Sequence, residues 1–346
     1  MFLKITSICS IGFVFFIHAQ LPAALNPKDD SIKSLILQGL DFSYTNRFEE
    51  ADRVFEQLIQ AYPYHPVGYF YKAANLQAQM LDAEDYEREQ DFYRLAERTI
   101  QLAESLQTAD RADSWILFYQ GSAFIYRSFM KMKIGNWLSA YKDARRGVSF
   151  LEKAVALDSS LYDAYLGIGS FTYWESAKAE FLLWLPFLSD HREQGVAMIY
   201  KAIERGEYIR QVGRDQLVWI LMDKKEYKEA FNLALQNHEA YPSGRFFKWS
   251  LASAAFRLGE WEISRRLYQE LLTEIQQLPQ NNHLNEIECL VKMAEIAAQN
   301  GQWTDAYQLS DRALRFNLNE SVRKRAKNKL QKALALRREA EQRIQP

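Results

Sequence analysis

A short residue pattern recurs along the chain and constrains the fold more than any other feature of the sequence. Three aromatic residues each stand three positions before a small residue: Tyr227 before Ala230, Trp261 before Ser264, and Trp303 before Ala306. The first two small residues are 34 positions apart, and the next interval is 42. The extra length falls on the polar stretch 276–283, where a loop can absorb it. This spacing is typical of helix pairs that stack because one pair cannot bury its apolar face alone.

The same template fits the beginning of the chain and, less closely, its middle. Phe48 follows a turn at Asn46, after a first helix that carries Gly39. Gly147 and Gly195 occupy matching positions 48 residues apart, which gives this unit an insertion of about 14 residues relative to the 34-residue tetratricopeptide period. Gly (14) and Pro (8) are scarce for 346 residues, which favours helices over sheets that need many turns.

The fold predicted from this pattern is all-α: a tetratricopeptide-like solenoid of helical hairpins with about seven units and a C-terminal helix. The expected solenoid spans residues 20–319, with degenerate repeats over 31–214 and clearer repeats over 215–319. Residues 320–346 are expected to form a basic capping helix.

Two stretches in the middle of the chain carry a resemblance to known proteins. GNWLSAYKDARRGVSFLEKAVALDSSLYDAYLGIGSFTYW, followed by LPFLSDHREQG, resembles a family of exported bacterial tetratricopeptide proteins of unassigned role. The likeness covers roughly residues 30–320, although His191 interrupts an expected Asp-Arg pair and serines replace a proline after Asp158. Tetratricopeptide proteins are in general scaffolds and adaptors that hold peptides in a concave groove, so the resemblance implies the fold and a binding role.

The first 19 residues have the layout of a secretory signal peptide. Lys4 precedes an apolar run over residues 5–17, and Ala19 offers a small residue for cleavage. The run is short for a membrane span, but an uncleaved N-terminal anchor remains the alternative. The sequence therefore predicts an exported protein that is periplasmic or associated with the cell envelope.

Catalytic and metal-binding patterns are absent from the sequence. The five histidines form no metal-ligand spacing, and no nucleophile elbow, phosphate loop or dinucleotide fingerprint occurs. The acidic run over residues 82–91 lacks the pattern of a calcium loop and is better explained as a solvated helix face or an extended turn. We therefore expect no metal, no cofactor and no enzymatic activity; a disguised active site would need convergent groups with shifted pKa values.

A concave aromatic groove is the predicted site of binding. The helix register places six aromatic residues on the first helices of their pairs, facing the concave side: Tyr44, Phe118, Tyr126, Tyr173, Trp174 and Trp219. Aromatic side chains bury a large area with little loss of rotamer freedom, which suits a peptide partner. The alternative for each residue is a place in the core between repeats.

Two further segments are candidate contact surfaces. The apolar residues 181–188 either pack inside the solenoid or form an exposed contact. From Glu320 onward, nine Lys and Arg stand against three Glu, so this helix could touch a membrane or an envelope polymer peripherally. With a net charge of −1, the chain as a whole has no attraction to nucleic acid.

The function predicted from the sequence is that of a non-catalytic scaffold of the cell envelope that holds a protein or peptide partner. The alternative is a soluble periplasmic binding protein for a small apolar ligand. An open groove would favour the peptide, and an enclosed pocket would favour the small ligand.

Overall fold

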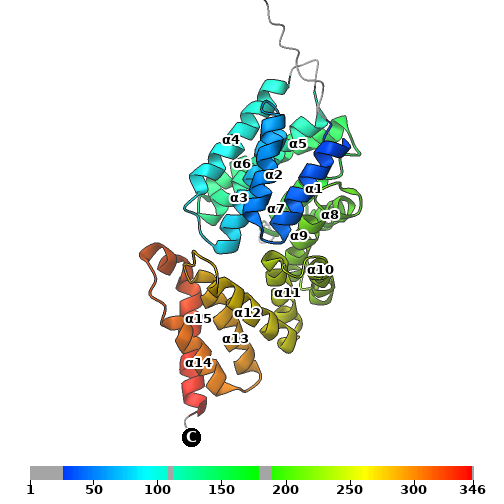
Figure 1. Ribbon diagram of the computed structural model, residues 1–346. Coiled ribbons are helices and arrows are strands. Elements are labelled where there is room, and N and C mark those ends of the chain that lie inside the picture. Colours follow the sequence, from blue (N-terminus) through cyan, green and yellow to red (C-terminus); the bar gives the residue numbers. More distant parts are fainter. Residues whose placement is uncertain (1–25, 108–111, 179–188, 345–346) are drawn as a thin grey trace, which may run out of the picture.

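The computed structural model describes residues 26–107, 112–178 and 189–344, and within them the chain is helical and without strands. In these described ranges, fourteen helices pair into seven antiparallel hairpins that stack into a curved superhelix, and one more helix follows (Figure 1). The predicted all-α, tetratricopeptide-type solenoid of about seven units with a terminal helix is confirmed. The pairs are α1 (Asp30–Tyr44) with α2 (Phe48–Ala61), α3 (Pro66–Ala83) with α4 (Glu89–Leu106), α5 (Ser114–Lys133) with α6 (Trp137–Leu157), α7 (Ala164–Lys178) with α8 (Arg192–Arg205), α9 (Arg210–Asp223) with α10 (Tyr227–Ala240), α11 (Arg245–Leu258) with α12 (Trp261–Gln276), and α13 (Leu284–Gln299) with α14 (Trp303–Leu314), and α15 (Glu320–Ile344) comes last.

We call α1 and the following odd-numbered helices up to α13 the A helices, and their partners the B helices. Five of the described A-to-B turns have the same backbone geometry. Each has one residue with positive φ, namely Asn46, Gly135, Lys225, Gly259 or Gly301. The next backbone N–H donates to a carbonyl of the last turn of the A helix, as from Arg47 to Phe42 at 2.8 Å and from Glu226 to Leu221 at 2.8 Å. An aromatic residue then begins the B helix: Phe48, Trp137, Tyr227, Trp261 or Trp303.

Glycine pairs allow two of the hairpins to close tightly. A Cβ on Gly121 would lie 2.7 Å from the carbonyl oxygen of Gly147, and a Cβ on Gly147 would lie 2.7 Å from that of Gly121. Gly169 and Gly195 face each other in the same way at 2.6 Å. Since real Cβ atoms do not come so close to backbone atoms, only glycine permits these crossings.

The A helices line the inner side of the curve. Within the described residues, each A helix contacts the next one, from α1 and α3 to α9 and α11, whereas consecutive B helices are not in comparable contact. Helices that touch their neighbours on both sides lie on the side of smaller radius. Functional side chains of a groove are therefore to be sought on the A helices.

The two ends of the superhelix meet. The turn after α3 lies next to the loop between α12 and α13 and to the first turns of α15 (Figure 1). Asn282 Nδ2 donates to the carbonyl of Glu84 at 2.8 Å, and an Arg325 guanidinium N–H donates to the same carbonyl at 2.7 Å. Asn285 Nδ2 donates to the carbonyl of Asp82 at 2.8 Å. The polar stretch that lengthens one repeat thus holds the first repeats against the last ones.

The terminal helix α15 packs against α13 and α14, and Val322, Ala326, Ala333 and Ala340 are buried along one face of it. Among the described residues, none of the helices is long and apolar enough to cross a membrane. The predicted signal peptide over residues 1–19 and the apolar segment 181–188 lie outside the described residues.

Candidate functional site

The inner side of the first repeats is filled with aromatic side chains instead of forming an open groove. Phe118 is buried, and its ring centroid lies 5.4 Å from that of Trp115. Tyr173 is fully buried, and its hydroxyl donates to Asp223 Oδ2 at 2.6 Å. Both residues were predicted to line the groove, but they belong to the hydrophobic core. Aromatic residues serve both uses at the same helical position. Here Phe118 packs against Trp115 on its own helix and Phe70 on α3, and Tyr173 packs against its neighbour Trp174.

Tyr44 and Tyr126 are also used in packing within the molecule. The ring of Tyr44 lies 5.2 Å from that of Tyr241 and 5.6 Å from that of Phe247, centroid to centroid, so it joins the first hairpin to the start of α11. Its hydroxyl is buried, and burial raises the pKa of Tyr44. Tyr126 is half-buried and packs edge-on against Phe70 at 5.5 Å.

The two tryptophans differ from the other four predicted residues. Trp174 is half-buried and lies edge-on against Tyr173 at 5.1 Å. Trp219 is 42% exposed, the largest exposure among the six. Trp219 is therefore the predicted site residue that the structure leaves most accessible.

Trp219 belongs to a small cluster that links two consecutive A helices. Its indole N–H donates to Oδ2 of Asp215 at 3.2 Å, one turn earlier on α9. The hydroxyl of Ser250 on α11 donates to Oδ1 of the same carboxyl group. Phe246, one turn before Ser250, is 39% exposed. Asp215 itself is buried, and burial raises its pKa to about 7 in spite of these two hydrogen bonds.

Phe246 was not among the site residues predicted from the sequence. Phe246 and Phe247 are adjacent, so they lie about 100° apart around the helix and cannot both face the core. Phe247 is fully buried, and Phe246 is the one left outside. A helical-wheel comparison of α9 and α11 would have placed Phe246 on the face of Trp219.

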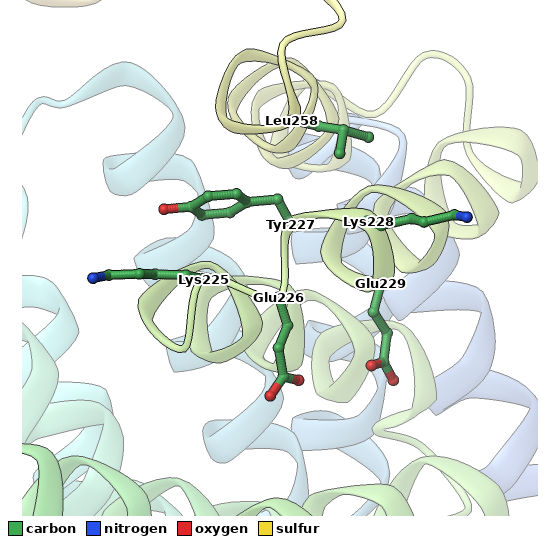
Figure 2. Close-up of a pocket in the computed structure, with 6 residues that line it drawn as sticks. All are labelled: Lys225, Glu226, Tyr227, Lys228, Glu229 and Leu258. Carbon is green, nitrogen blue, oxygen red and sulfur yellow. The ribbon is translucent and has the colours of Figure 1, made fainter.

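A hollow in the surface of the described residues lies away from the predicted groove, at the turn between α9 and α10 (Figure 2). It has a volume of about 390 Å³ and is lined by Lys225, Glu226, Tyr227, Lys228, Glu229 and Leu258. Four of these six side chains are charged, and Figure 2 shows them pointing in different directions instead of converging on one point. The hollow is wide open to solvent and therefore lacks the enclosure that a small apolar ligand needs.

The acidic run over residues 82–91 is structural. Asp82 is buried and pairs with Arg245, with Nε 3.0 Å from Oδ1. Glu84 pairs with Lys133 at 3.0 Å and with Arg325 at 3.5 Å. The run spans the turn between α3 and α4, which is one of the two predicted alternatives, and its first residues also hold the two ends of the superhelix together. Among the described residues, no three His, Cys, Asp or Glu side chains are grouped as metal ligands.

The basic helix α15 is partly neutralised by the rest of the chain. Lys329 pairs with Glu288, and Arg337 pairs with Asp311 at 3.2 Å. Lys324 and Lys327 lie on the opposite, exposed face and pair with no carboxylate in the described part of the chain. Within the described residues, exposed cations without a carboxylate partner therefore lie in the first turns of α15 and, at Arg338, near its end.

Comparisons with solved structures agree with the architecture. The chain is similar to the Cut9–Hcn1 hetero-tetramer of APC/C, with a TM-score of 0.52 and 12% identity over 89% of this chain and 54% of that one. It spans about half of that chain, and identity this low concerns the fold alone. Similarity to the C-terminal part of a TPR repeat-containing protein from Cytophaga hutchinsonii (TM-score 0.41, 20% identity, 83% of this chain and 97% of that one) and to yeast Tom70 (TM-score 0.42, 15% identity, 92% and 66%) is weaker. No protein-family model and no curated protein matches the sequence.

Proposed function

We propose that this protein is a non-catalytic scaffold that holds a protein or peptide partner on the inner side of its superhelix. The observation that carries the proposal is the pair of exposed aromatic side chains, Trp219 on α9 and Phe246 on α11, on either side of Asp215. Tryptophan is enriched among the residues that dominate binding energy in protein interfaces, and aromatic side chains in general bury a large apolar area there. We include the half-buried Trp174, on the preceding A helix α7, in the proposed surface.

A peptide or protein surface suits this site better than a small apolar ligand. The two aromatic side chains sit exposed on neighbouring A helices, so an extended segment can lie across both of them. A small ligand needs a cavity that encloses most of its surface. The hollow beside Tyr227 is open to solvent and does not enclose a ligand in this way.

Binding is favoured over catalysis by the surroundings of Asp215. Its carboxyl group has a raised pKa, as catalytic acids often do. However, its two described hydrogen-bond partners are the indole of Trp219 and the hydroxyl of Ser250, and neither is a base that could work with it. We assign Asp215 to the positioning of Trp219.

We further propose that the protein is exported and works in the cell envelope. The layout of residues 1–19 supports export. The exposed cations Lys324 and Lys327 support a peripheral contact between α15 and an anionic membrane or envelope polymer. Cell fractionation with N-terminal sequencing tests this: we expect a mature chain that begins near Gln20, and recovery in the cytoplasm with Met1 intact would refute it.

The partner surface is tested by site-specific photo-crosslinking in the native cell. A benzophenone amino acid replaces Trp219 or Phe246 in separate variants, and Leu157 at the exposed end of α6 in a matched control. We expect the same adduct band from positions 219 and 246 and none from position 157. Adducts of equal intensity at all three positions, or none at 219 and 246, would contradict the proposed surface.

A further inference from the structure

The turn between α5 and α6 exposes a dense group of apolar side chains. Trp137 is 65% exposed and Leu138 is 70% exposed. We call this group the apolar tip; its members are Met132, Ile134, Trp137, Leu138 and Tyr141. Every residue from Met132 to Leu138 is exposed, and a Cβ on Gly135 would meet nothing within 4 Å. The tip therefore protrudes from the body of the molecule.

The fold does not require these residues. At the other four turns that share the backbone geometry of the α5–α6 turn, the aromatic residue that begins the B helix is half-buried: Phe48, Tyr227, Trp261 and Trp303. The residue after each of them is polar: Glu49, Lys228, Glu262 and Thr304. Only the α5–α6 turn, among these five, exposes its aromatic residue and follows it with leucine. A property other than folding must explain the apolar tip, because exposed apolar clusters are otherwise rare.

Basic residues surround the apolar tip. Residues 131–146 contain five cations, Lys131, Lys133, Lys142, Arg145 and Arg146, and one carboxylate, Asp143. Asp143 is already held by Arg127 at 2.7 Å and Lys131 at 2.6 Å. On α6, Lys142 follows Leu138 by about one turn, or roughly 6 Å along the helix axis. Lys142 is exposed and pairs with no carboxylate within the described residues.

Nearby carboxylates weaken this positive charge without cancelling it. Arg145 lies 3.4 Å from Glu175, which also accepts a hydrogen bond from Tyr141 at 2.9 Å. Arg146 lies 3.4 Å from Glu104. Both arginines are more than half exposed, so these pairs are loose surface contacts that salt and competing anions can replace.

We propose that the apolar tip inserts into the interface of a lipid bilayer that contains anionic lipid. Tryptophan and tyrosine are enriched at the level of the lipid headgroups, and amphipathic segments sink about 5–10 Å into that region. The one-turn distance from Leu138 to Lys142 matches this depth. It leaves the cations at the headgroups, where they attract anionic lipid.

Charge favours the bilayer over a second copy of this chain as the occupant. Two apolar tips facing each other would bring together the exposed Lys142 of both copies and their loosely paired Arg145 and Arg146, and like charges at an interface oppose association. The protruding shape points the same way. A convex turn offers no walls for a protein partner to fill, whereas a bilayer deforms around it.

This inference deepens the membrane contact proposed for α15 but depends on different residues. Glu84 connects the two regions, because it pairs with Lys133 beside the apolar tip and with Arg325 on α15. The first turns of α15 and the base of the tip therefore lie close together. Separate variants of each region keep the two proposals distinguishable.

The experiment measures flotation of the full chain with two kinds of vesicle, one of phosphatidylcholine and one of equal parts phosphatidylcholine and phosphatidylglycerol. Leu138→Glu copies the residue present at Glu49 and Glu262, and Trp137→Ala removes the indole. We expect each to lower partitioning onto the mixed vesicles about tenfold, since a large apolar side chain contributes that much when it is buried. Tyr64→Ser, which removes an aromatic residue that is 70% exposed elsewhere, is the matched control and should leave binding unchanged.

A second measurement locates the indole directly. Brominated acyl chains quench a tryptophan only on contact, so the full chain should lose more fluorescence on brominated vesicles than Trp137→Phe does. Lys324→Glu with Lys327→Glu tests α15: a loss of flotation in that variant alone would support the α15 contact and overturn the tip.

Three other outcomes would overturn the proposal. Unchanged flotation and equal quenching in the tip variants would remove the bilayer as the occupant. Association that rises with protein concentration and disappears in Leu138→Glu would identify a second copy instead. A large drop in melting temperature in Leu138→Glu and Trp137→Ala would mean that another part of this chain covers the tip.

Discussion

Arg245 and Asp82 form an ion pair across 163 residues of sequence, with Nε of the arginine 3.0 Å from Oδ1 of the aspartate. Both side chains are largely withdrawn from solvent. The backbone N–H of Arg245 also donates to Oδ1 of Asn46 at 2.8 Å, in the first A-to-B turn. A single residue at the start of α11 thus fixes two turns of the N-terminal repeats, and a solenoid whose units normally touch only their neighbours is closed onto itself.

Asp82→Ala should therefore destabilise and open the molecule. Removing one partner of a buried ion pair leaves an uncompensated charge and costs about 3–5 kcal/mol of unfolding free energy. We expect a lower denaturant midpoint and a larger radius of gyration in small-angle X-ray scattering. Arg88→Ala is the control, because its pair with Asp91 is exposed and is worth no more than about 1 kcal/mol. Equal midpoints for the two variants would show that the closure carries little stability.

The small residues of the repeat provide a second test of stability. Ala230 and Ala306 are fully buried at the contacts of their helices. Ala230→Phe and Ala306→Phe should overpack these contacts and cost roughly 1–3 kcal/mol each, as read from urea denaturation. Ala335→Phe, at an exposed position on α15, should cost far less. If all three variants unfold at the same urea concentration as the parent chain, the assignment of the repeat is wrong.

The fold could be predicted from the sequence because the same residue pattern recurs at the same helix contact in several repeats. Ala230, Ser264 and Ala306 each mark the crossing of an A helix with its B helix, and all three are buried. The closure of the superhelix could not be predicted in this way. Asp82 and Arg245 are not part of the repeated pattern. Their ion pair forms only because several stacked hairpins bring α3 and α11 together.

The candidate site was less predictable than the fold for a related reason. The helix register predicts that Trp219 faces the inner side, but the register cannot tell whether the inner side is open. Phe118 and Tyr173 are buried, whereas Trp219 on α9 and Phe246 on α11 are exposed. The exposed apolar tip at Trp137 has the same register as four half-buried aromatic residues, so pattern alone assigns it to packing.

The raised pKa of Asp215, at about 7, makes stability depend on pH. An unfolded aspartate titrates near 3.9, so between about pH 4 and pH 7 the folded chain binds a proton that the unfolded chain has released. Unfolding free energy should therefore fall as pH rises through this window, by up to about 1.4 kcal/mol per pH unit, and level off above it.

Asp215→Asn isolates this effect, since the amide keeps the shape and cannot ionise. We expect the variant to match the parent chain near pH 5 and to exceed it by roughly 1–3 kcal/mol near pH 8, measured by urea denaturation at both values. Asp91→Asn, at a partly exposed carboxylate, controls for the general effect of removing a charge. A variant that loses stability equally at both pH values would show that Asp215 is ionised in the folded chain throughout.

Alanine variants of the predicted groove residues distinguish a contact surface from a hydrophobic core. Trp219→Ala should change the melting temperature little, because truncation of an exposed side chain usually costs under about 0.5 kcal/mol. It should weaken partner binding by about 2 kcal/mol or more if Trp219 anchors the partner. Tyr173→Ala, two helices away at a fully buried position, should instead cost roughly 3–5 kcal/mol of stability.

Trp174→Ala lies between these limits, because Trp174 is half-buried against Tyr173. We expect a loss of stability smaller than that of Tyr173→Ala and a loss of binding smaller than that of Trp219→Ala. Thermal melts of the three variants can be compared before any partner is known. If Trp219→Ala melts as low as Tyr173→Ala, the indole is held by the fold and the hydrogen bond to Asp215 is part of the core. The contact surface would then have to lie elsewhere on the A helices, with Phe246 as its remaining exposed aromatic residue.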